Sequence, residues 1–237
     1  MGDMTEFSVA TFNTHWGLDF AGIPYDVIGA IGSLDADLVG LQECWRPAPD
    51  AGYVHEAAKD LGMEVAWGPF VGGPHGGTWR RVHWEGEEEA AFGVVVLSRW
   101  PILHRRLIPL GKMPGDMNRA VLEVVVDVDG RPVHFCAAHL CMLPHGSLFQ
   151  LVQLRAVLHA PADEASVLCG DFNMWGPVVA ALVGRRRAHV AKTWPAHRPH
   201  SQIDHVLLHG PLQAVGGEVL PPLGSDHRAL RVHLRLP

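Results

Sequence analysis

The stretch Val167-Leu168-Cys169-Gly170-Asp171-Phe172-Asn173 joins a short apolar run to two polar residues. The apolar part predicts a buried strand that ends at Gly170. In layered α/β proteins, polar chemistry is commonly located at the carboxyl end of such a strand. Asp171 and Asn173, two residues apart on an extended backbone, would point to the same side and could hold a phosphate, a water molecule or a hard cation. A turn with an Asx cap explains the same two residues equally well.

The bulk composition describes a folded globular protein. The chain has 237 residues, of which 48% are hydrophobic and 19% charged. We see no linker, low-complexity tract or internal repeat, so one domain over residues 1–237 is expected. No apolar run approaches the ~20 residues that cross a bilayer, and the N-terminus lacks the pattern of a signal peptide. We therefore expect a cytoplasmic protein without stable membrane insertion, and the sequence suggests no protein partner.

Cysteine and charge usage narrow the class further. The cysteines lie in or beside apolar runs and form no Cys-x-x-Cys pair, which predicts reduced, mostly buried thiols and no structural zinc site. The net charge is −6, and the only basic run, Arg185-Arg186-Arg187, is expected to be solvated. This balance disfavours a dedicated duplex binder, although an enzyme that contacts a few phosphates is compatible with it. The four cysteines are Cys44, Cys136, Cys141 and Cys169.

Hydrophobic periodicity predicts about ten strands and four helices. Because the helices do not alternate strictly with the strands, one doubly wound parallel sheet does not fit. The pattern predicts an α+β, four-layer α/β/β/α sandwich of two mixed, mainly antiparallel sheets with helices on the outer faces. Asp50 is expected to cap the second helix, and Asp129-Gly130 to turn a hairpin. Strands are expected at 7–12, 38–42, 64–67, 92–97, 102–108, 120–128, 132–138, 167–170, 206–208, 214–220 and 229–236, and helices at 23–34, 51–61, 147–159 and 175–183.

Carboxylate, amide or imidazole side chains follow or directly adjoin six of these apolar runs. Taken singly, Asn13 could be a turn residue, and Glu43 could belong to a buried salt bridge instead of a metal site. Six such ends are better explained if they converge on one edge of the sandwich. Oxygen-rich ligation favours Mg²⁺ or Mn²⁺ over zinc, and a metal with histidines nearby suggests attack on a phosphate by water. The six ends carry Asn13, Glu43, His139, Asp171 with Asn173, Asp204, and Asp226 with His227.

The ordered set of motifs resembles the endonuclease/exonuclease/phosphatase superfamily. That DNase I-like fold is shared by DNase I-like nucleases, abasic-site endonucleases, inositol polyphosphate 5-phosphatases and neutral sphingomyelinases. Gly93 to Pro101 is similar to the central strand of the family and its Ser-Arg-x-Pro exit. The other motifs are Phe12-Asn13, Leu41-Gln42-Glu43, His139-Leu140, Gly170-Asp171-Phe172-Asn173, Ile203-Asp204-His205 and Ser225-Asp226-His227.

The resemblance implies a Mg²⁺ site, with Mn²⁺ as a substitute. Glu43 would be the main ligand, with Asn13 beside it and Asp226 completing the site. His15 stands where some abasic-site enzymes carry an Asp, and this departure puts the metal geometry on that side in doubt.

The resemblance also implies catalytic and substrate-binding roles. Asp171 would orient or deprotonate the attacking water, and Asn173 would hold a phosphate oxygen. His227 would act as a base or as an electrostatic stabiliser, with its imidazole held by Asp204. His139 would contact the phosphate or protonate the leaving oxygen.

Other residues keep two interpretations or a structural one. Arg119 resembles a family arginine that meets phosphate, and a surface ion pair is its alternative. His134 is expected to point away from the face of His139, and His205 away from Asp204. The loop at 68–89 could stack on a base or cover the core through its aromatic and basic residues, which are Trp79, Arg80, Arg81 and Trp84.

The predicted activity is that of a Mg²⁺-dependent phosphoesterase. We expect a nuclease-like enzyme that hydrolyses a phosphodiester by metal-assisted, in-line attack of water, acting on nucleic acid or on a small phosphorylated molecule. A phosphomonoesterase acting on a small molecule or an inositol or lipid headgroup is the first alternative. A non-catalytic binding module of the same fold is the second, although every position of the catalytic set holds a competent residue.

Overall fold

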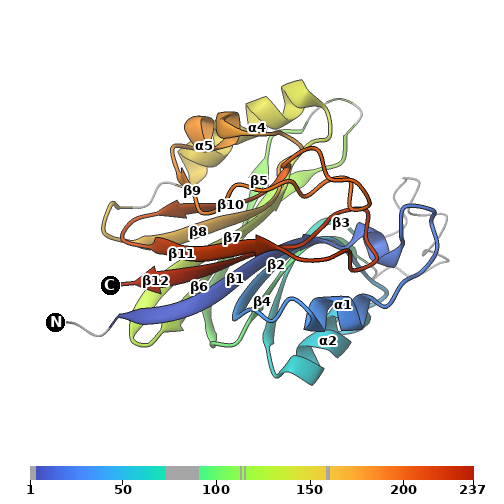
Figure 1. Ribbon diagram of the computed structural model, residues 1–237, viewed down its shortest axis with the longest axis horizontal. Coiled ribbons are helices and arrows are strands. Elements are labelled where there is room, and N and C mark those ends of the chain that lie inside the picture. The colour runs from blue at the N-terminus through green and yellow to red at the C-terminus, as the bar shows by residue number, and fades with distance from the viewer. Residues whose placement is uncertain (1–3, 73–90, 113, 115, 159–160) are drawn as a thin grey trace.

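Two six-stranded sheets pack face to face in the computed structural model, which describes residues 4–72, 91–112, 114, 116–158 and 161–237 (Figure 1). The first sheet has the strand order β11-β12-β1-β2-β4-β3 and the second β5-β6-β7-β8-β10-β9. The first contains β1 (Thr5–Asn13), β2 (Leu38–Arg46), β3 (Glu64–Gly72), β4 (Ala91–Ser98), β11 (Gln213–Val219) and β12 (Leu230–Leu236). The second contains β5 (Ile102–Leu110), β6 (Arg119–Val128), β7 (Arg131–His139), β8 (Ala165–Asp171), β9 (Arg186–Arg187) and β10 (Asp204–His209).

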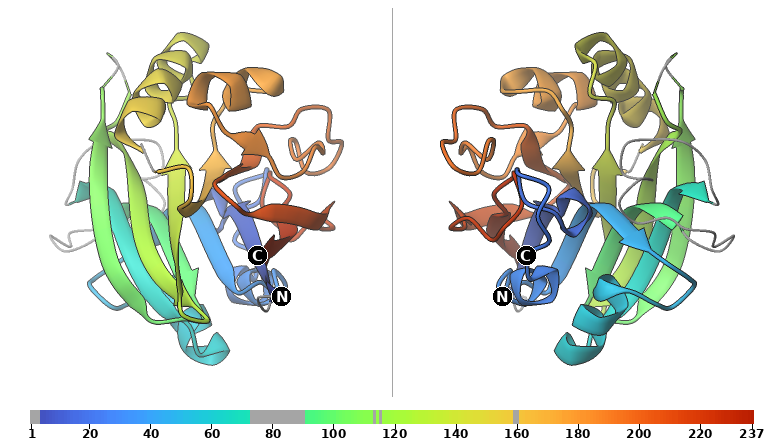
Figure 2. Two further views of the ribbon diagram at one scale, coloured as in Figure 1. Left: turned by 90° about the vertical axis from the view of Figure 1, so that its left-hand side faces the viewer. Right: turned by 90° about the vertical axis from the view of Figure 1, so that its right-hand side faces the viewer.

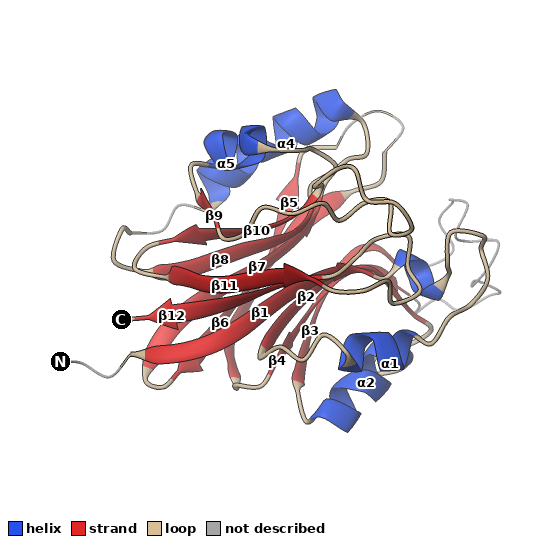
Figure 3. Ribbon diagram, viewed as in Figure 1, coloured by secondary structure: helices blue, strands red, loops and turns tan. Residues whose placement is uncertain are grey.

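Helices form the two outer layers, as the sequence predicts (Figures 2 and 3). One apolar cluster lies under α1 and α2, a second lies between the sheets, and a third lies under α4 and α5. Alternate residues of each strand therefore face either the partner sheet or a helix layer. The helices are α1 (Val27–Gly32), α2 (Tyr53–Leu61), α4 (Pro144–Val157) and α5 (Pro177–Val183), with a 3₁₀ turn η1 at His15–Gly17.

Each sheet contains one parallel pair of strands. These are β1 with β2 and β7 with β8; the other neighbouring strands are antiparallel. The connections β1-α1-β2 and β7-α4-β8 are helical crossovers, which parallel pairing requires. Because parallel strands end at the same edge, these two pairs bring four carboxyl ends to one side of the molecule.

Two glycines near that edge allow β8 to approach β2 in the opposite sheet and β7 in its own sheet. A Cβ at Gly40 of β2 would lie 2.4 Å from the Sγ atom of Cys169 in the opposite sheet. Gly170 of β8 has φ +146°, and a Cβ there would lie 1.9 Å from the carbonyl oxygen of Ala138 in β7. A side chain at either position would force the backbone or its neighbour to move.

Several local predictions are wrong at the boundaries. Gly52, not Asp50, is the N-cap of α2; the side chain of Asp50 is exposed and lies 3.6 Å from His55. Helix α4 begins at Pro144, earlier than the predicted 147, because proline suits the first turn of a helix. Twelve strands are present in the described ranges, where about ten were expected, and β9 is one of the additions.

The basic run is partly buried, which corrects the prediction that it is solvated. Arg185 is 8% exposed and donates hydrogen bonds to Ser166 Oγ at 2.9 Å and to the Leu158 carbonyl at 3.2 Å.

All four cysteines are free and buried, as predicted. Within the described ranges, each helix is too short or too polar to cross a membrane.

Candidate active site

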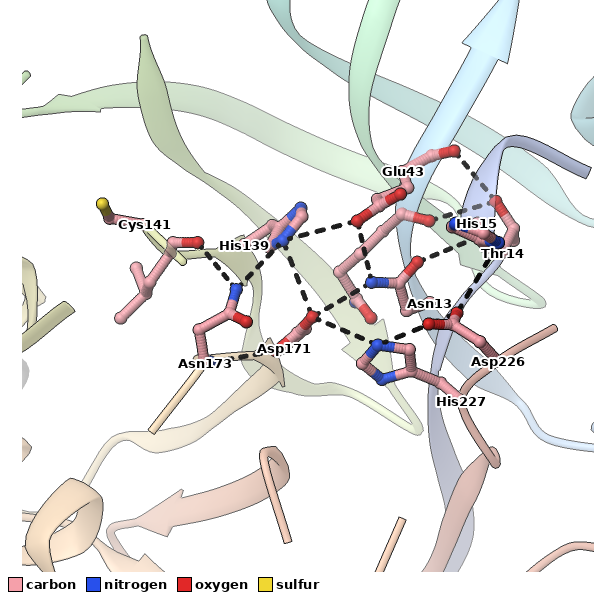
Figure 4. A network of polar contacts seen from close by, with 12 residues as sticks. Asn13, Thr14, His15, Glu43, His139, Cys141, Asp171, Asn173, Asp226 and His227 are labelled. Atoms are coloured by element: carbon pink, nitrogen blue, oxygen red, sulfur yellow. Dashed lines mark hydrogen bonds and ion pairs between the residues drawn. The ribbon is translucent and has the colours of Figure 1, made fainter. Parts of the chain in front are cut away.

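Polar side chains from both sheets meet at the edge where the parallel strands end (Figure 4). Asn13 and Glu43 come from β1 and β2, and His139 and Asp171 from β7 and β8. His227 lies just before β12. The clearest link between the sheets is the hydrogen bond from Asn13 Nδ2 to Asp171 Oδ2, at 3.0 Å. The predicted convergence of strand ends is therefore present, although the role of each residue is a separate question.

Glu43 reaches the site because β2 bulges. The register between β2 and β4 shifts between Leu41 and Cys44, and Glu43 has φ +53°. A bulge of this kind redirects a side chain, and left-handed φ in a non-glycine residue costs about 1–3 kcal/mol. Asn13 Nδ2 donates to Glu43 Oε1 at 3.3 Å, whereas Glu43 Oε2 is buried without a hydrogen-bond partner among the described residues. Burial raises the pKa of Glu43.

Asn13 orients two carboxylates. Its amide nitrogen donates to both Glu43 and Asp171, and its Oδ1 accepts the backbone N–H of His15 at 2.9 Å. Ser225 Oγ donates to the carbonyl of Asn13 at 2.7 Å, which anchors the strand end from the chain segment before β12. Asn13 is thus a structural centre of the cluster.

Asp171 and Asn173 form a turn and also belong to the cluster. The backbone N–H of Asn173 donates to Asp171 Oδ1 at 2.9 Å, and Asn173 has φ +49°. The expectation of an extended backbone through Asn173 is therefore wrong, because β8 ends at Asp171 and an Asx turn follows. Asn173 Nδ2 still points into the site, 3.3 Å from His139 Nε2 and 3.1 Å from the Leu140 carbonyl, to which it donates. Burial raises the pKa of Asp171 to about 7, although the charge of His227 opposes this shift.

His227 is held by Asp204. Its Nδ1 atom lies 3.1 and 3.0 Å from the two carboxylate oxygens of Asp204, and its Nε2 lies 3.7 Å from Asp171 Oδ2. Burial by itself lowers the pKa of His227, but the carboxylates of Asp204 and Asp171 outweigh that effect and raise it to about 10. Asp204 therefore fixes the ring so that Nε2 faces the centre of the cluster.

His139 and Arg119 form the other flank. His139 Nε2 lies 3.6 Å from Asp171 Oδ2 and 3.8 Å from Glu43 Oε1, while its buried Nδ1 has no hydrogen-bond partner among the described residues. Burial lowers the pKa of His139 well below its usual range, and the charge of Arg119 adds to this. Arg119 is paired with Asp116 through Nε at 3.2 Å and Nη2 at 3.0 Å. The side chain of Arg119 is 2% exposed and that of Asp116 is 11% exposed, so Arg119 forms an ion pair, as its alternative interpretation holds, but not one at the surface.

Asp226 lies on the far side of His227. Its Oδ1 is 4.0 Å from His227 Nε2 and 3.7 Å from His15 Nδ1, and Trp194 Nε1 donates to its Oδ2 at 3.3 Å. His15, the residue that departs from the family pattern, lies at the rim of the site, where its Nδ1 is 3.0 Å from the Leu18 carbonyl oxygen.

The cluster has the donors that a divalent cation needs. Its most compact acidic and histidine group is Asp171, Asp204 and His227, whose candidate ligand atoms lie within 4.8 Å of one another. In that group Asp204 is already engaged by the ring of His227. Among the described residues, the buried Glu43 Oε2 has no hydrogen-bond partner, and it is a stronger indication of where a cation would bind, because an unpaired buried carboxylate oxygen is costly. The donor set therefore fits a hard cation held on the side of Glu43.

A hydroxyl layer beneath Glu43 was not predicted. Thr14 Oγ1 donates to the Glu43 carbonyl at 3.0 Å and lies 3.1 Å from the Tyr53 hydroxyl, and Tyr25 donates to the Thr14 carbonyl at 2.8 Å. Trp45 N in turn donates to Tyr53 at 3.1 Å. These contacts hold the bulge from the side of α1 and α2. The sequence contains only two tyrosines, and both lie here, but their spacing alone gives no signal of it.

Two histidines that the sequence places outside the site do lie outside it. His134 contacts Glu123 and Glu164, away from His139. His205 is buried, stacks on Phe172 with ring centres 5.7 Å apart, and so faces away from the cluster. The residues proposed for base stacking, which are Trp79, Arg80, Arg81 and Trp84, lie outside the described residues.

Comparison with known proteins agrees with this architecture. The model of the Endonuclease/Exonuclease/phosphatase family matches residues 10–227. A search of curated proteins finds no match.

Solved structures share the fold at low sequence identity. An endonuclease/exonuclease/phosphatase from Beutenbergia cavernae superposes with a TM-score of 0.72 at 24% identity, covering 98% of this chain and 72% of that one. A mannosyl-6-phosphatase from Bacteroides thetaiotaomicron gives 0.67 at 14% identity, with 96% and 99% covered. A humanized D. rerio TDP2 gives 0.66 at 19% identity, with 97% and 98% covered. At these identities the likeness establishes the fold.

Proposed function

The chain belongs to the endonuclease/exonuclease/phosphatase family, and from this premise we propose that it is a phosphoesterase. We propose specifically a Mg²⁺-dependent hydrolase that cleaves a phosphodiester, in the manner of a nuclease, by in-line attack of water. One observation carries the proposal: Glu43, Asp171 and His227 come from three distant segments and meet at one edge of the sandwich (Figure 4), where Glu43 Oε2 has no hydrogen-bond partner among the described residues. Such a cluster is costly to a fold unless a ligand compensates for it.

Glu43 is the proposed principal ligand of the cation, with Asn13 and Asp226 completing the site. Asn13 Oδ1 accepts one N–H and keeps a second lone pair for the metal. Bound Mg²⁺, or Mn²⁺ in its place, neutralises phosphate charge and polarises the phosphoryl oxygen. The hydroxyl layer of Thr14, Tyr25 and Tyr53 supports Glu43 from behind.

Asp171 is the proposed base for the attacking water. It is buried, and its carboxylate is held by N–H groups of Asn13 and Asn173 on separate oxygens. In the reaction, the water oxygen bonds to phosphorus and the ester P–O bond breaks. Asp171 takes the water proton, and the leaving oxygen is protonated from solvent.

Four further side chains would bind the charge of the phosphate. Asp204 engages the Nδ1 of His227, which leaves Nε2 to stabilise the charge that develops on the phosphoryl oxygens. Asn173 and His139 are proposed to contact the phosphate from the opposite flank, since their polar atoms lie 3.3 Å apart at the strand ends. Arg119 is the proposed source of a further cationic contact on that flank.

A phosphomonoesterase is the second candidate. The same cluster could act on a monoester, and the fold neighbours include a mannosyl-6-phosphatase.

The free, buried thiols support the expectation of a cytoplasmic location.

The test is an activity panel on the purified chain with Mg²⁺, Mn²⁺ or EDTA. Substrates are bis(p-nitrophenyl) phosphate, p-nitrophenyl phosphate, plasmid DNA, RNA, mannose 6-phosphate and inositol phosphates. The proposal predicts metal-dependent turnover, with the diester faster than the monoester, and loss of that turnover in His227→Ala. Preference for monoesters would support the second candidate. Absence of turnover on all substrates would support a non-catalytic binding module.

A further inference from the structure

A cavity of about 500 Å³ lies beside the candidate active site, on the flank of Arg119. We call it the Arg119 cavity. Its walls include Phe70 from β3 and three apolar residues of β5, and its polar members lie at the start of β6. Its volume is within the ~300–1,000 Å³ range of small-molecule pockets. The lining side chains used below are Phe70, Leu107, Pro109, Leu110, Asn118 and Arg119.

The sheet register sets the cavity next to the phosphate end of the site. Strand β6 begins where its antiparallel neighbour β7 ends, since Val121 pairs with Ala138. Arg119 and His139 therefore lie at the same edge. In the other sheet, the end of β3 lies beside the start of β4, which in turn pairs with the end of β2 just after Glu43. The cavity thus continues the row of strand ends beyond His139, away from His227.

Arg119 lies between the cluster and the cavity, and one N–H donor group of its guanidinium, Nη1, is not used by Asp116. The residue is 3% exposed, and Asp116 engages its Nε and Nη2 atoms. Nη1 is buried and has no hydrogen-bond partner among the described residues. An unsatisfied buried donor on a cation is costly, so a ligand acceptor that reaches it is favoured.

Apart from Arg119 and Asn118, the walls are apolar. Leu110 is buried and Leu107 is 39% exposed, so the cavity opens to solvent past Leu107. The Arg119 guanidinium lies 6.0 Å from the centre of the Phe70 ring, which gives the two residues one continuous surface. Among the lining residues, a polyhydroxylated or charged group would meet only the side chains of Asn118 and Arg119 as polar partners, whereas an apolar group would gain from burial against the others.

We propose that the Arg119 cavity receives the ester arm of the substrate, and that this arm is uncharged and apolar. Arg119 Nη1 then binds an oxygen of the phosphate to which the arm is attached, and Phe70 and Leu107 enclose the arm. The inference rests on the proposed function, because it assumes that the phosphate lies at the strand ends. Among esters cleaved by the proposed nuclease-like mechanism, it favours those whose ester oxygen carries an apolar group over sugar or inositol phosphates.

The test measures binding, so that it does not depend on turnover. Dissociation constants are measured by calorimetry with Mg²⁺ for phenylphosphonate, methylphosphonate and 2,3-dihydroxypropylphosphonate, which resist hydrolysis and carry one arm each. We expect phenylphosphonate to bind at least ~10-fold more tightly than the dihydroxypropyl compound, a typical discrimination for an apolar pocket. Leu107→Asp should reduce this preference at least ~5-fold.

Leu103→Asp is the matched control, because Leu103 lies on the same strand β5, is 62% exposed and does not line the cavity. It should leave the preference unchanged. Leu107→Ser serves as a milder second variant if Leu107→Asp is unstable. Equal affinity for the three phosphonates, no binding of any of them, or equal effects of the Leu103 and Leu107 variants would overturn the inference.

The outcomes separate this inference from the proposed function. Apolar preference in a protein that turns over none of the reporter esters supports the cavity and contradicts the phosphoesterase. Turnover of reporter esters with no apolar preference among the phosphonates supports the phosphoesterase and contradicts the cavity assignment.

Discussion

Two histidine–carboxylate pairs in this fold have nearly the same local geometry and very different surroundings. His227 Nδ1 lies 3.0 Å from Asp204 Oδ2, and His134 Nδ1 lies 3.1 Å from Glu123 Oε1. Bonding to a carboxylate raises the histidine pKa in both pairs. The side chain of His227 is 7% exposed, however, and that of His134 is 26% exposed.

The difference lies at the second ring nitrogen. His227 Nε2 faces Asp171 in the convergence of strand ends. His134 Nε2 faces Glu164, an ordinary partner on the sheet surface, and Glu123 is shared with Arg106, whose Nη2 lies 2.6 Å from it. The pair alone therefore does not identify a site. What identifies it is that the second nitrogen of His227 points at another buried carboxylate, that of Asp171, within the cluster of strand ends.

The largest predicted difference in turnover is between the alanine substitutions of the two histidines. We expect His227→Ala to lower turnover of the diester reporter by ~10²–10⁴-fold, the usual effect of a positioned catalytic group. His134→Ala should stay within about 2-fold of the wild type, because its partners lie outside the site. Steady-state kinetics on both variants, after matched thermal unfolding, checks this. Near-full activity in His227→Ala would remove its assigned role.

Neutralising the two carboxylates should give a smaller contrast. Asp204→Asn keeps the shape of the side chain but removes the charge that holds the His227 ring, so we expect kcat to fall ~10–100-fold. Glu123→Gln is the matched control and should leave kcat unchanged. Similar losses in the two variants would mean that Asp204 acts through general stability, and not through the orientation of His227.

The partly buried His134–Glu123 pair should affect the stability of the protein and not its activity. The hydrogen bond with Glu123 raises the pKa of His134, so the contribution of this histidine is complete below pH about 6.5 and is lost as pH rises through its folded-state pKa. The same bond lowers the pKa of Glu123, so that contribution is complete above pH about 4.5 and is lost as pH falls through its folded-state pKa.

The expected excess stability of wild type over His134→Gln is therefore greatest between these two limits. Its size should be about 0.5–1 kcal/mol, as for partly exposed pairs. Urea unfolding of both proteins from pH 4 to pH 9 measures it. A difference that does not vary with pH would show that packing, and not ionisation, is responsible.

Sequence reasoning predicted the architecture because period-two apolar runs and their polar ends are local signals. The runs that end at Asn13, His139 and Asp171 identify three of the four central strand ends. The family resemblance supplied the order of the motifs and hence the fold. The polar residues of the predicted strand ends lie together in the structure, and their roles stay predictions.

The remaining features depend on contacts that the sequence does not encode locally. The bulge that turns Glu43 into the site follows from the register with β4, and its hydroxyl support comes from two different segments. The burial of Arg119 and of Arg185 reflects tertiary packing that overrides the usual exposure of arginine. The Asx turn at Asn173 was one of two interpretations of its motif, and the structure combines it with the site interpretation.

The central claim is that Glu43 holds a divalent cation on which hydrolysis depends. The most direct measurement is a Mg²⁺ titration of turnover for wild type, Glu43→Ala and the control Glu123→Ala, which removes a carboxylate outside the site. We predict that the half-saturating Mg²⁺ concentration rises at least ~10-fold in Glu43→Ala, since losing one ligand weakens a hard-cation site substantially, and that the Glu123→Ala curve overlays that of the wild type. A Glu43→Ala curve that also overlays the wild type, or wild-type turnover that survives complete chelation, would contradict the claim.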